Sequence, residues 1–394
     1  MTANSLHIFT TWLDEYRIEE SLTEKLNSLT LIEACPPKTA DKWLLSSALQ
    51  KLIRRGATSL AIAVAIKVHQ VDSLYLRSRL PIIAIEDIGM GDLNVCQAVL
   101  SFCSSAQWWG PKAHKTIALL IALMATALKS RSACDAFSLT ETSTDRHYRL
   151  AELLAFDTES LVNLACNIDE SQLTRLFVLR ILGGITVFDK GTYQTLSSCN
   201  LKALDSVAVR LSLPPTVRWL MARQRKTAGM AALLPIAFEA GHNALVHTVR
   251  EFPRAQDNIG GLPLCTLDMY TKLGRTALKR FYETTKALQD FVSQHVHRHD
   301  PQPLINLAMF QIESSLLDQF LSSPKLDDLK DTTDATEMEC LGMVDPSNRH
   351  ELYRLLRENS HFLADIRIDL LNSLFLTQES IRANPPAQLT LNGC

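Results

Sequence analysis

The stretch SALQKLIRRG occupies residues 47–56, and the apolar run LAIAVAIKV follows it at residues 60–68. In and just before the first stretch, Leu45, Leu49 and Leu52 recur at steps of three and four, which indicates one apolar face of a helix. Three basic residues are expected to lie off that face: Lys51, Arg54 and Arg55. The second run is apolar on all sides, which is typical of a helix buried among others. Two such helices joined by a short turn favour an all-α fold.

Helical periodicity continues through most of the chain. A helix is expected from Leu74 to about Ile85, and Pro81 inside it should kink or break it. The apolar segment 117–128 is shorter than the roughly twenty residues that cross a bilayer, so it predicts a buried core helix. The run Ile185–Phe188 is the best strand candidate. The predicted fold class is therefore an all-α, multi-helix array.

Composition shifts along the chain predict five parts. They are a helical domain at 1–145, a second helical domain at 146–322, an acidic linker at 323–350, a C-terminal helix at 351–383 and a tail at 384–394. Residues 130–145 are rich in Ser, Thr and Asp and are expected to form an irregular loop. The acidic residues of 323–350 are expected to be a solvated connection.

Charge and cysteine content exclude several classes of protein. A formal net charge of −2 argues against coating nucleic acid by bulk charge, although it permits a local basic face. The nine cysteines are odd in number and none forms a C-x-x-C pair, which favours reduced thiols in a cytosolic protein. Residues 1–10 lack the basic and apolar parts of a secretory signal. We expect a cytoplasmic protein that does not enter a membrane.

Three stretches between residues 47 and 137 share their order and character with a known family. They are SALQKLIRRG at 47–56, the segment from DSLY at 72–75 to IEDIG at 85–89, and LKSRSA at 128–133. Together they resemble the C-terminal helical region of the RarA/MgsA family of clamp-loader-like AAA+ ATPases. In that family the region follows the ATPase core. The resemblance implies self-assembly into tetramers and a setting in DNA repair and at replication forks.

The motif that would cradle a nucleotide is not found in this sequence. A phosphate-binding loop needs G-x-x-x-x-G-K-[ST], whose backbone N–H groups and lysine hold the phosphates. The nearest string, GPKAHKT at 110–116, lacks the second glycine and the Gly-Lys step. We therefore expect no ATP hydrolysis and no cofactor. Neither a zinc motif nor a nucleophile elbow supports another catalytic site.

Charged residues gather around the IEDIG stretch, and they are the first site candidates: Arg77, Arg79, Glu86 and Asp87. Two interpretations are open. The acids cap the next helix or pair with the two arginines, or the group forms an interface or contacts a ligand.

The loop-to-helix segment 262–276 is the second candidate site. Four of its residues precede a basic helix that contains Lys279 and Arg280: Asp268, Tyr270, Thr271 and Arg275. A helix N-terminus of this kind can bind phosphate. Alternatively, Asp268 or Thr271 only caps the helix.

Two further patterns have a structural and a functional interpretation. A basic run could follow a nucleic-acid backbone with Trp219 as a stacking platform, or it is a solvated helix face: Arg218, Trp219, Arg223, Arg225 and Lys226. Lys279 and Arg280 are further candidates for nucleic-acid contact. Alternating His295, His297 and His299 could bind a metal on a strand, but a helix end or surface is favoured because no zinc pattern accompanies them.

These patterns favour a non-catalytic helical assembly or adaptor protein in DNA transactions, in replication, repair, a mobile element or a defence system. Protein partners are expected, self-association among them, and direct DNA contact is left open. One alternative is a nucleotide- or phosphate-binding enzyme that uses Asp268–Arg280. Another is a basic-groove DNA binder through Arg218–Lys226, whose affinity would fall steeply with salt.

Overall fold

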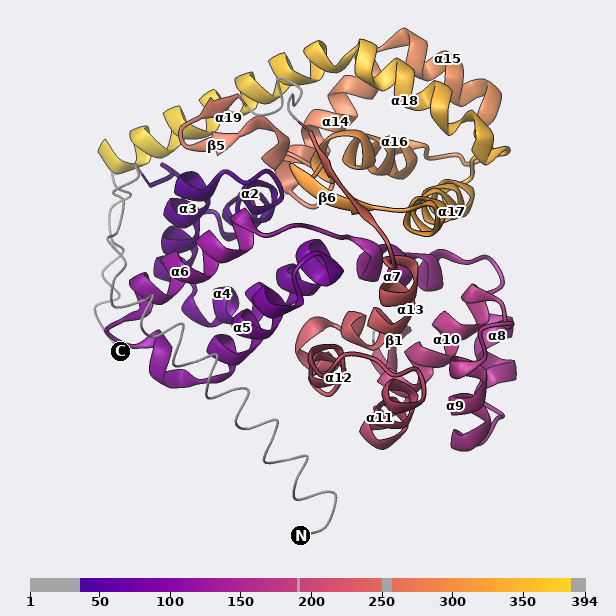
Figure 1. The fold of residues 1–394 in the computed structure, drawn as a ribbon. Helices are drawn as coiled ribbons and strands as arrows, with labels where there is room; N and C mark the ends of the chain where they lie inside the picture. The colour runs from indigo at the N-terminus through magenta and orange to yellow at the C-terminus, as the bar shows by residue number, and fades with distance from the viewer. Residues whose placement is uncertain (1–35, 190–191, 250–256, 384–394) are drawn as a thin grey trace, which may run out of the picture.

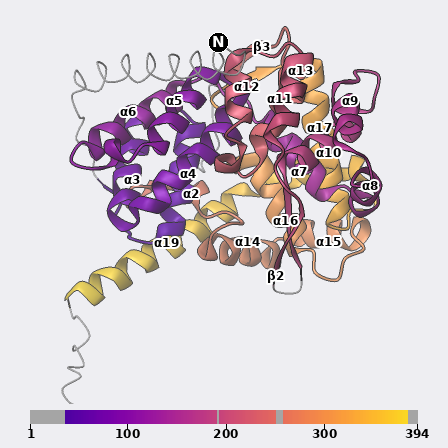
Figure 2. The same ribbon diagram turned by 90° about the horizontal axis from the view of Figure 1, so that it is seen from below.

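The fold is all-α, as predicted, in a computed structural model that describes residues 36–189, 192–249 and 257–383. Three groups of helices surround the middle of the molecule (Figure 1). Helices α2–α6 lie on one side, α7–α13 on the other, and α14–α18 complete the third group, with α19 running along the top. The view from below keeps α2–α6 and α8–α10 on opposite sides (Figure 2). The predicted tail at 384–394 and the predicted lack of a signal at 1–10 concern residues outside the described ones.

The first group packs around α3, which contacts α2, α4 and α6. Its helices are α2 (Lys42–Arg54), α3 (Thr58–Val71), α4 (Ser73–Ile83), α5 (Leu93–Ser104) and α6 (Ala113–Thr126), with short turns η2 (Gly89–Gly91) and η3 (Ala106–Trp109). Asp41 caps α2 by accepting from the Leu44 N–H, and Asp72 caps α4 by accepting from the Tyr75 N–H. These caps satisfy N–H groups that helix ends leave without partners.

Pro81 does not break its helix. Helix α4 continues through Pro81 to Ile83 and passes directly into the π-helical turn η1 (Ala84–Ile88). The predicted disruption therefore takes the form of a wider turn just after the proline, and this turn carries Glu86 and Asp87. Such π turns inside α-helices often lie at functional sites.

The second group begins at α7, a few residues after the end of α6. Its helices are α7 (Ser132–Thr142), α8 (Arg146–Leu153), α9 (Thr158–Cys166), α10 (Gln172–Gly183), α11 (Leu201–Arg210), α12 (Pro215–Met221) and α13 (Leu234–Ala240), with turns η4 (Gln224–Thr227) and η5 (Met230–Leu233). The expected irregular loop at 130–145 is wrong, because α7 fills most of it. Ala133, Ala136 and Leu139 of α7 are buried at helical spacing, and this small apolar face went unrecognised among polar residues.

The third group contains the remaining helices: α14 (Lys272–Thr284), α15 (Lys286–His295), α16 (Gln302–Met309), α17 (Pro324–Cys340), α18 (Arg349–Glu358) and α19 (Ser360–Ala383). Its turns are η7 (Leu264–Thr266), the π-helical η8 (Phe310–Ser314) and η9 (Pro346–Asn348). The single helix expected at 351–383 is two helices, α18 and α19.

The acidic linker expected at 323–350 is wrong, because α17 occupies residues 324–340. Ser323 caps this helix, and Pro324 suits its first turn. Leu326, Leu329 and Thr333 are buried on one face, and that face packs against α7. The acidic residues lie mainly on the other faces of α17. A high content of acidic residues therefore could not distinguish a solvated loop from a half-buried helix.

The described strands form three small antiparallel pairs. The run predicted at 185–188 is confirmed as β1 (Ile185–Asp189), which pairs with β2 (Thr192–Ser197). The other pairs are β3 (Leu245–Thr248) with β6 (Gln319–Ser322) and β4 (Asn258–Ile259) with β5 (Leu262–Pro263). Backbone N–H of Lys129 donates to Gln319 O at 3.1 Å, which joins the first group to β6.

Two hydrophobic clusters form the core of the described residues. The larger one includes residues of α2–α13 and also Leu329 of α17 and Leu371 and Phe375 of α19, so the boundary expected between 145 and 146 falls inside it. The smaller one gathers α14–α18 around Phe281 and Leu352. In the described part of the chain, no helix is long and apolar enough to span a membrane.

Candidate functional site

Asp87 lies where all three family-like stretches meet. Its side chain is fully buried. Oδ1 accepts from Arg54 Nε at 2.7 Å and from Arg131 Nη1 at 2.5 Å, and Oδ2 accepts from Gln50 Nε2 at 2.9 Å. Burial alone would raise the pKa of Asp87, but the Arg54 and Arg131 guanidiniums hold it below its usual value. The carboxylate is therefore charged. It joins residues that lie about forty positions before it and about forty positions after it in the sequence.

The backbone of the IEDIG stretch also approaches the LKSRSA stretch closely. The Ser130 N–H donates to Asp87 O at 3.1 Å. Gly89 has φ +44°, and a Cβ there would lie 2.8 Å from Ser130 O. This position requires glycine, both for its backbone angle and for the close approach.

Glu86 completes the charged cluster. It lies 3.0 Å from Arg54 Nη2, 3.5 Å from Arg79 Nη2 and 3.6 Å from Arg131 Nη1. Arg79 also donates to Gln50 Oε1 at 2.9 Å. Glu86, Asp87 and Arg79 thus come together as expected. Arg77 does not join them, because it donates to the carbonyls of Cys103 and Ser104 at the end of α5.

The basic segment of α2, defined as Lys51, Arg54 and Arg55, is buried, although the sequence placed it off the apolar face. Arg54 Nη1 donates to Ser314 O and Arg55 Nη2 donates to Glu313 O, both at 2.8 Å. These carbonyls belong to the π-helical turn η8 at the end of α16, where the negative end of a helix dipole favours cations. The basic segment therefore holds the first group to the third.

Lys51 makes the second link between the groups. Its Nζ donates to Asp268 Oδ2 at 2.5 Å and to Ser47 Oγ, and the two charged side chains are 3% and 2% exposed. Ser47 Oγ donates in turn to Thr266 O at 2.9 Å. Burial lowers the pKa of Lys51, although Asp268 opposes this.

A third buried pair extends the link to the last helix. Arg367 of α19 contacts Glu313 at 2.8 Å and donates to Leu267 O at 3.0 Å. Charged side chains thus pair where α2, α14, η8 and α19 meet. The partners in each pair lie more than fifty residues apart in the sequence.

The segment 268–275 is part of this junction. Asp268 pairs with Lys51, and Thr271 caps α14 by accepting from the Gly274 N–H at 3.0 Å. Arg275 donates to Met269 O, and the ring of Tyr270 packs edge-on against Phe310. Lys279 and Arg280 are exposed farther along α14. Asp268 and Thr271, two of the candidates for a phosphate site, are therefore occupied by structural contacts.

The Thr271 cap gives a direct test of this assignment. Thr271→Ala should lower the free energy of unfolding by about 1 kcal/mol, because the Gly274 N–H loses its acceptor. Thr276→Ala, in the middle of the same helix, should leave stability unchanged or slightly raised. Urea unfolding followed by circular dichroism measures both. Equal stability of the two variants would contradict the capping role.

The predicted nucleic-acid residues are spread over different environments. Arg218 pairs with Asp205, and Trp219 is only 5% exposed with the Arg223 guanidinium 3.6 Å from its ring centroid. Arg225 and Lys226 are exposed, and Lys226 donates to Ser104 Oγ. Trp219 is therefore covered and is not the stacking platform that the sequence suggested.

The histidine string does not converge on one point. His295 ends α15 and its Nδ1 lies 3.2 Å from Asn348 Nδ2, while the His297 N–H donates to Gly342 O. Over the residues that the structure describes, no group of three or more His, Cys, Asp or Glu side chains is arranged to hold a metal ion.

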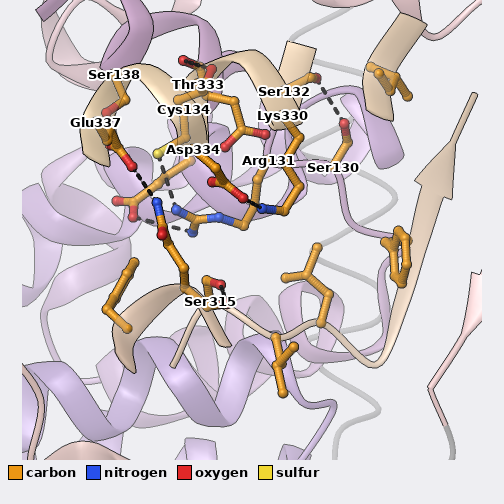
Figure 3. A pocket seen from close by; sticks show the side chains of 18 of the residues that line it. Ser130, Arg131, Ser132, Cys134, Ser138, Ser315, Lys330, Thr333, Asp334 and Glu337 are labelled. Carbon is orange, nitrogen blue, oxygen red and sulfur yellow. Dashed lines mark hydrogen bonds and ion pairs between the residues drawn. The ribbon is translucent and has the colours of Figure 1, made fainter. Parts of the chain in front are cut away.

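A cavity of about 300 Å³ opens beside the Asp87 cluster (Figure 3). One wall comes from α7 and α17, with Arg131, Lys330 and Glu337 among the side chains that line it. The other wall comes from η8, the loop after it and β6. The sequence offered no sign of this cavity, because α7 and α17 were both expected to be loops.

Comparison with known proteins identifies one region. Residues 64–150 match the family model described as "MgsA AAA+ ATPase C terminal", which is less than a quarter of the chain. The match includes the IEDIG and LKSRSA stretches, whereas the opening stretch at 47–56 precedes it. It confirms the resemblance in this region. No curated protein and no solved structure matches the chain.

Proposed function

We propose that this chain is a non-catalytic helical assembly or adaptor protein in DNA transactions. The observation that carries the proposal is the match of residues 64–150 to the C-terminal module of an AAA+ ATPase family, in a chain whose sequence offers no phosphate-binding loop. The resemblance implies self-assembly and a replication or repair setting, within a cytoplasmic, mobile-element or defence context.

The buried junction supports a role as a rigid body. One ion pair and two hydrogen bonds from arginines to backbone carbonyls tie the basic segment of α2 to residues more than two hundred positions away. The first group is therefore held against the second half of the chain. A rigid scaffold presents a fixed surface to a partner, which lowers the entropic cost of binding. This arrangement suits an assembly protein better than a hinged enzyme.

An exposed apolar patch on the first group supplies a surface for self-association. We define it by Trp43, Val71 and Leu74, of which Trp43 and Leu74 are 60% and 76% exposed. Trp43 packs edge-on against Tyr75, and Lys42 pairs with Asp72 beside it. Aromatic and aliphatic side chains surrounded by polar ones are typical of interface centres.

The patch makes a specific prediction. Leu74→Glu should weaken self-association by tenfold or more, on the order of 1.4 kcal/mol, because a charge would be buried in the interface. Leu201→Glu is the matched control, since Leu201 is an exposed leucine at the start of α11 in the second group. Sedimentation at several protein concentrations measures both. Equal self-association of the two variants would exclude this patch as the contact surface.

The decisive experiment is the mass of the native complex recovered from cells, with and without nuclease. The proposal expects a complex heavier than one chain that survives nuclease treatment if protein contacts hold it. A chain that stays monomeric at high concentration and binds neither DNA nor a replication protein would overturn it. The phosphate-binding enzyme alternative has less support, because Asp268 is paired with Lys51 and Thr271 caps α14.

A further inference from the structure

The two walls of the cavity beside the Asp87 cluster differ in the kind of side chain that lines them. Acidic side chains gather on the α7, α17 and η1 side: Glu86, Asp135, Asp327, Asp334 and Glu337. Apolar side chains form the opposite wall: Tyr270, Leu307, Phe310, Leu316, Leu317 and Phe320. Enclosed, largely apolar sites with a few polar groups on one side are typical of small-molecule pockets.

The two cations that line the cavity are already paired with carboxylates. Arg131 donates to Asp87, lies 3.6 Å from Glu86 and also contacts Cys134 Sγ at 3.3 Å. Lys330 pairs with Asp334 across one turn of α17. Glu337 accepts from Ser138 and from Gln311 Nε2, which are neutral groups that leave its charge uncompensated. Five carboxyl groups against two cations leave the lining with an excess of negative charge.

Among the acids that line the cavity, Asp135 has the fewest direct contacts to its carboxylate in the described part of the chain. Among the described residues, no hydrogen bond or ion pair to its carboxylate is found, although Arg131 and Lys330 lie near enough to act on it electrostatically. It lies in the first turn of α7 and lines the cavity. A carboxylate held in such a place is costly unless a cation compensates it.

We propose that this cavity binds a small organic amine, with its ammonium group at Asp135 and Glu337 and its apolar body against Phe310, Leu316 and Phe320. The apolar wall would remove the hydrocarbon part of the ligand from water. The ammonium would give the Asp135 carboxylate a direct positively charged partner. An anion of the same shape is disfavoured, because it would meet the excess of carboxylates. This site is independent of the assembly role proposed above.

The probes are three phenylalkyl compounds of similar size and different charge: 3-phenylpropylamine, 3-phenylpropanol and 3-phenylpropionate. Calorimetric titration of the full chain at pH 7.5 should give saturable binding of the amine, at least about tenfold tighter than of the other two. Equal or tighter binding of the carboxylate overturns the proposed ligand class. No saturable binding of the amine at millimolar concentration overturns the site.

Two variants locate the binding. Asp135→Asn should abolish the preference for the amine, whereas Asp328→Asn removes the same charge from an exposed position on α17 and should keep it. Ser315→Trp should fill the cavity and block all three compounds without a change in charge. Equal loss in the Asp135 and Asp328 variants would mean that only net charge matters, and it would overturn the proposal.

The pH dependence gives a further readout. Burial raises the pKa of Asp135 to about 6; Arg131 and Lys330 oppose this shift, while Asp334 and Asp87 add to it. Amine binding should therefore weaken as the pH falls through 6 and Asp135 takes up a proton. This dependence should become smaller in Asp135→Asn, where Glu337, whose pKa is also raised by burial, remains to take up a proton. Affinity that stays constant between pH 5 and pH 7.5 in the unsubstituted chain would contradict the role of Asp135.

Discussion

Asp87→Ala is expected to lower the free energy of unfolding by roughly 3–5 kcal/mol, because it deprives two guanidiniums, one fully and one mostly buried, of a carboxylate that they share. Arg54 and Arg131 both donate to Asp87 Oδ1, and Gln50 loses its acceptor as well. A loss of this size is a large part of the total stability of an ordinary domain. The variant should therefore be partly unfolded or aggregate at physiological temperature.

The measurement is urea unfolding followed by circular dichroism, with Asp328→Ala as the control. Asp328 is exposed on α17, and its replacement should change stability by less than about 0.5 kcal/mol. Because the pKa of Asp87 lies below its usual 3.8, its stabilising effect is present above that pH and is lost as the pH falls. A change below about 1 kcal/mol at pH 7 would contradict the central role of Asp87.

The Lys51–Asp268 pair gives the second large effect. Lys51→Met alone should cost roughly 3–5 kcal/mol, since it leaves the Asp268 carboxylate buried without a cation. Adding Asp268→Leu should recover most of this loss, because a buried ion pair can be replaced by apolar groups of similar size. A double-mutant cycle from urea unfolding separates the pair from its surroundings. Two additive losses would show that these side chains act separately and do not join the groups.

The sequence was sufficient wherever one apolar face or a local cap defined an element. Leu45, Leu49 and Leu52 predicted α2 from their spacing, and the run at 185–188 predicted β1. The resemblance at 72–89 and 128–133 identified the region that the family model matches. Each of these signals lies within about twenty residues of chain.

The sequence was insufficient where charged residues are buried. Arg54 is neutralised by Asp87, 33 residues away, and donates to the carbonyl of Ser314, 260 residues away, and no local pattern shows either contact. A charge on a helix is usually solvated, so the basic segment of α2 was placed off the buried face. The same reasoning led to the prediction of an acidic linker where α17 lies. The cavity that α17 forms with α7 could therefore not be predicted from the sequence.

The convergence of three stretches on Asp87 also limits how this chain could be divided or inherited. The region that matches the family begins at residue 64, after Gln50 and Arg54, yet both are partners of the carboxylate at its centre. A gene fragment cut at the limits of the match would leave that carboxylate without Gln50 and Arg54, two of its three side-chain partners. The smallest piece that recombination could move intact therefore includes α2, and through Lys51 and Arg55 it reaches into the second half of the gene.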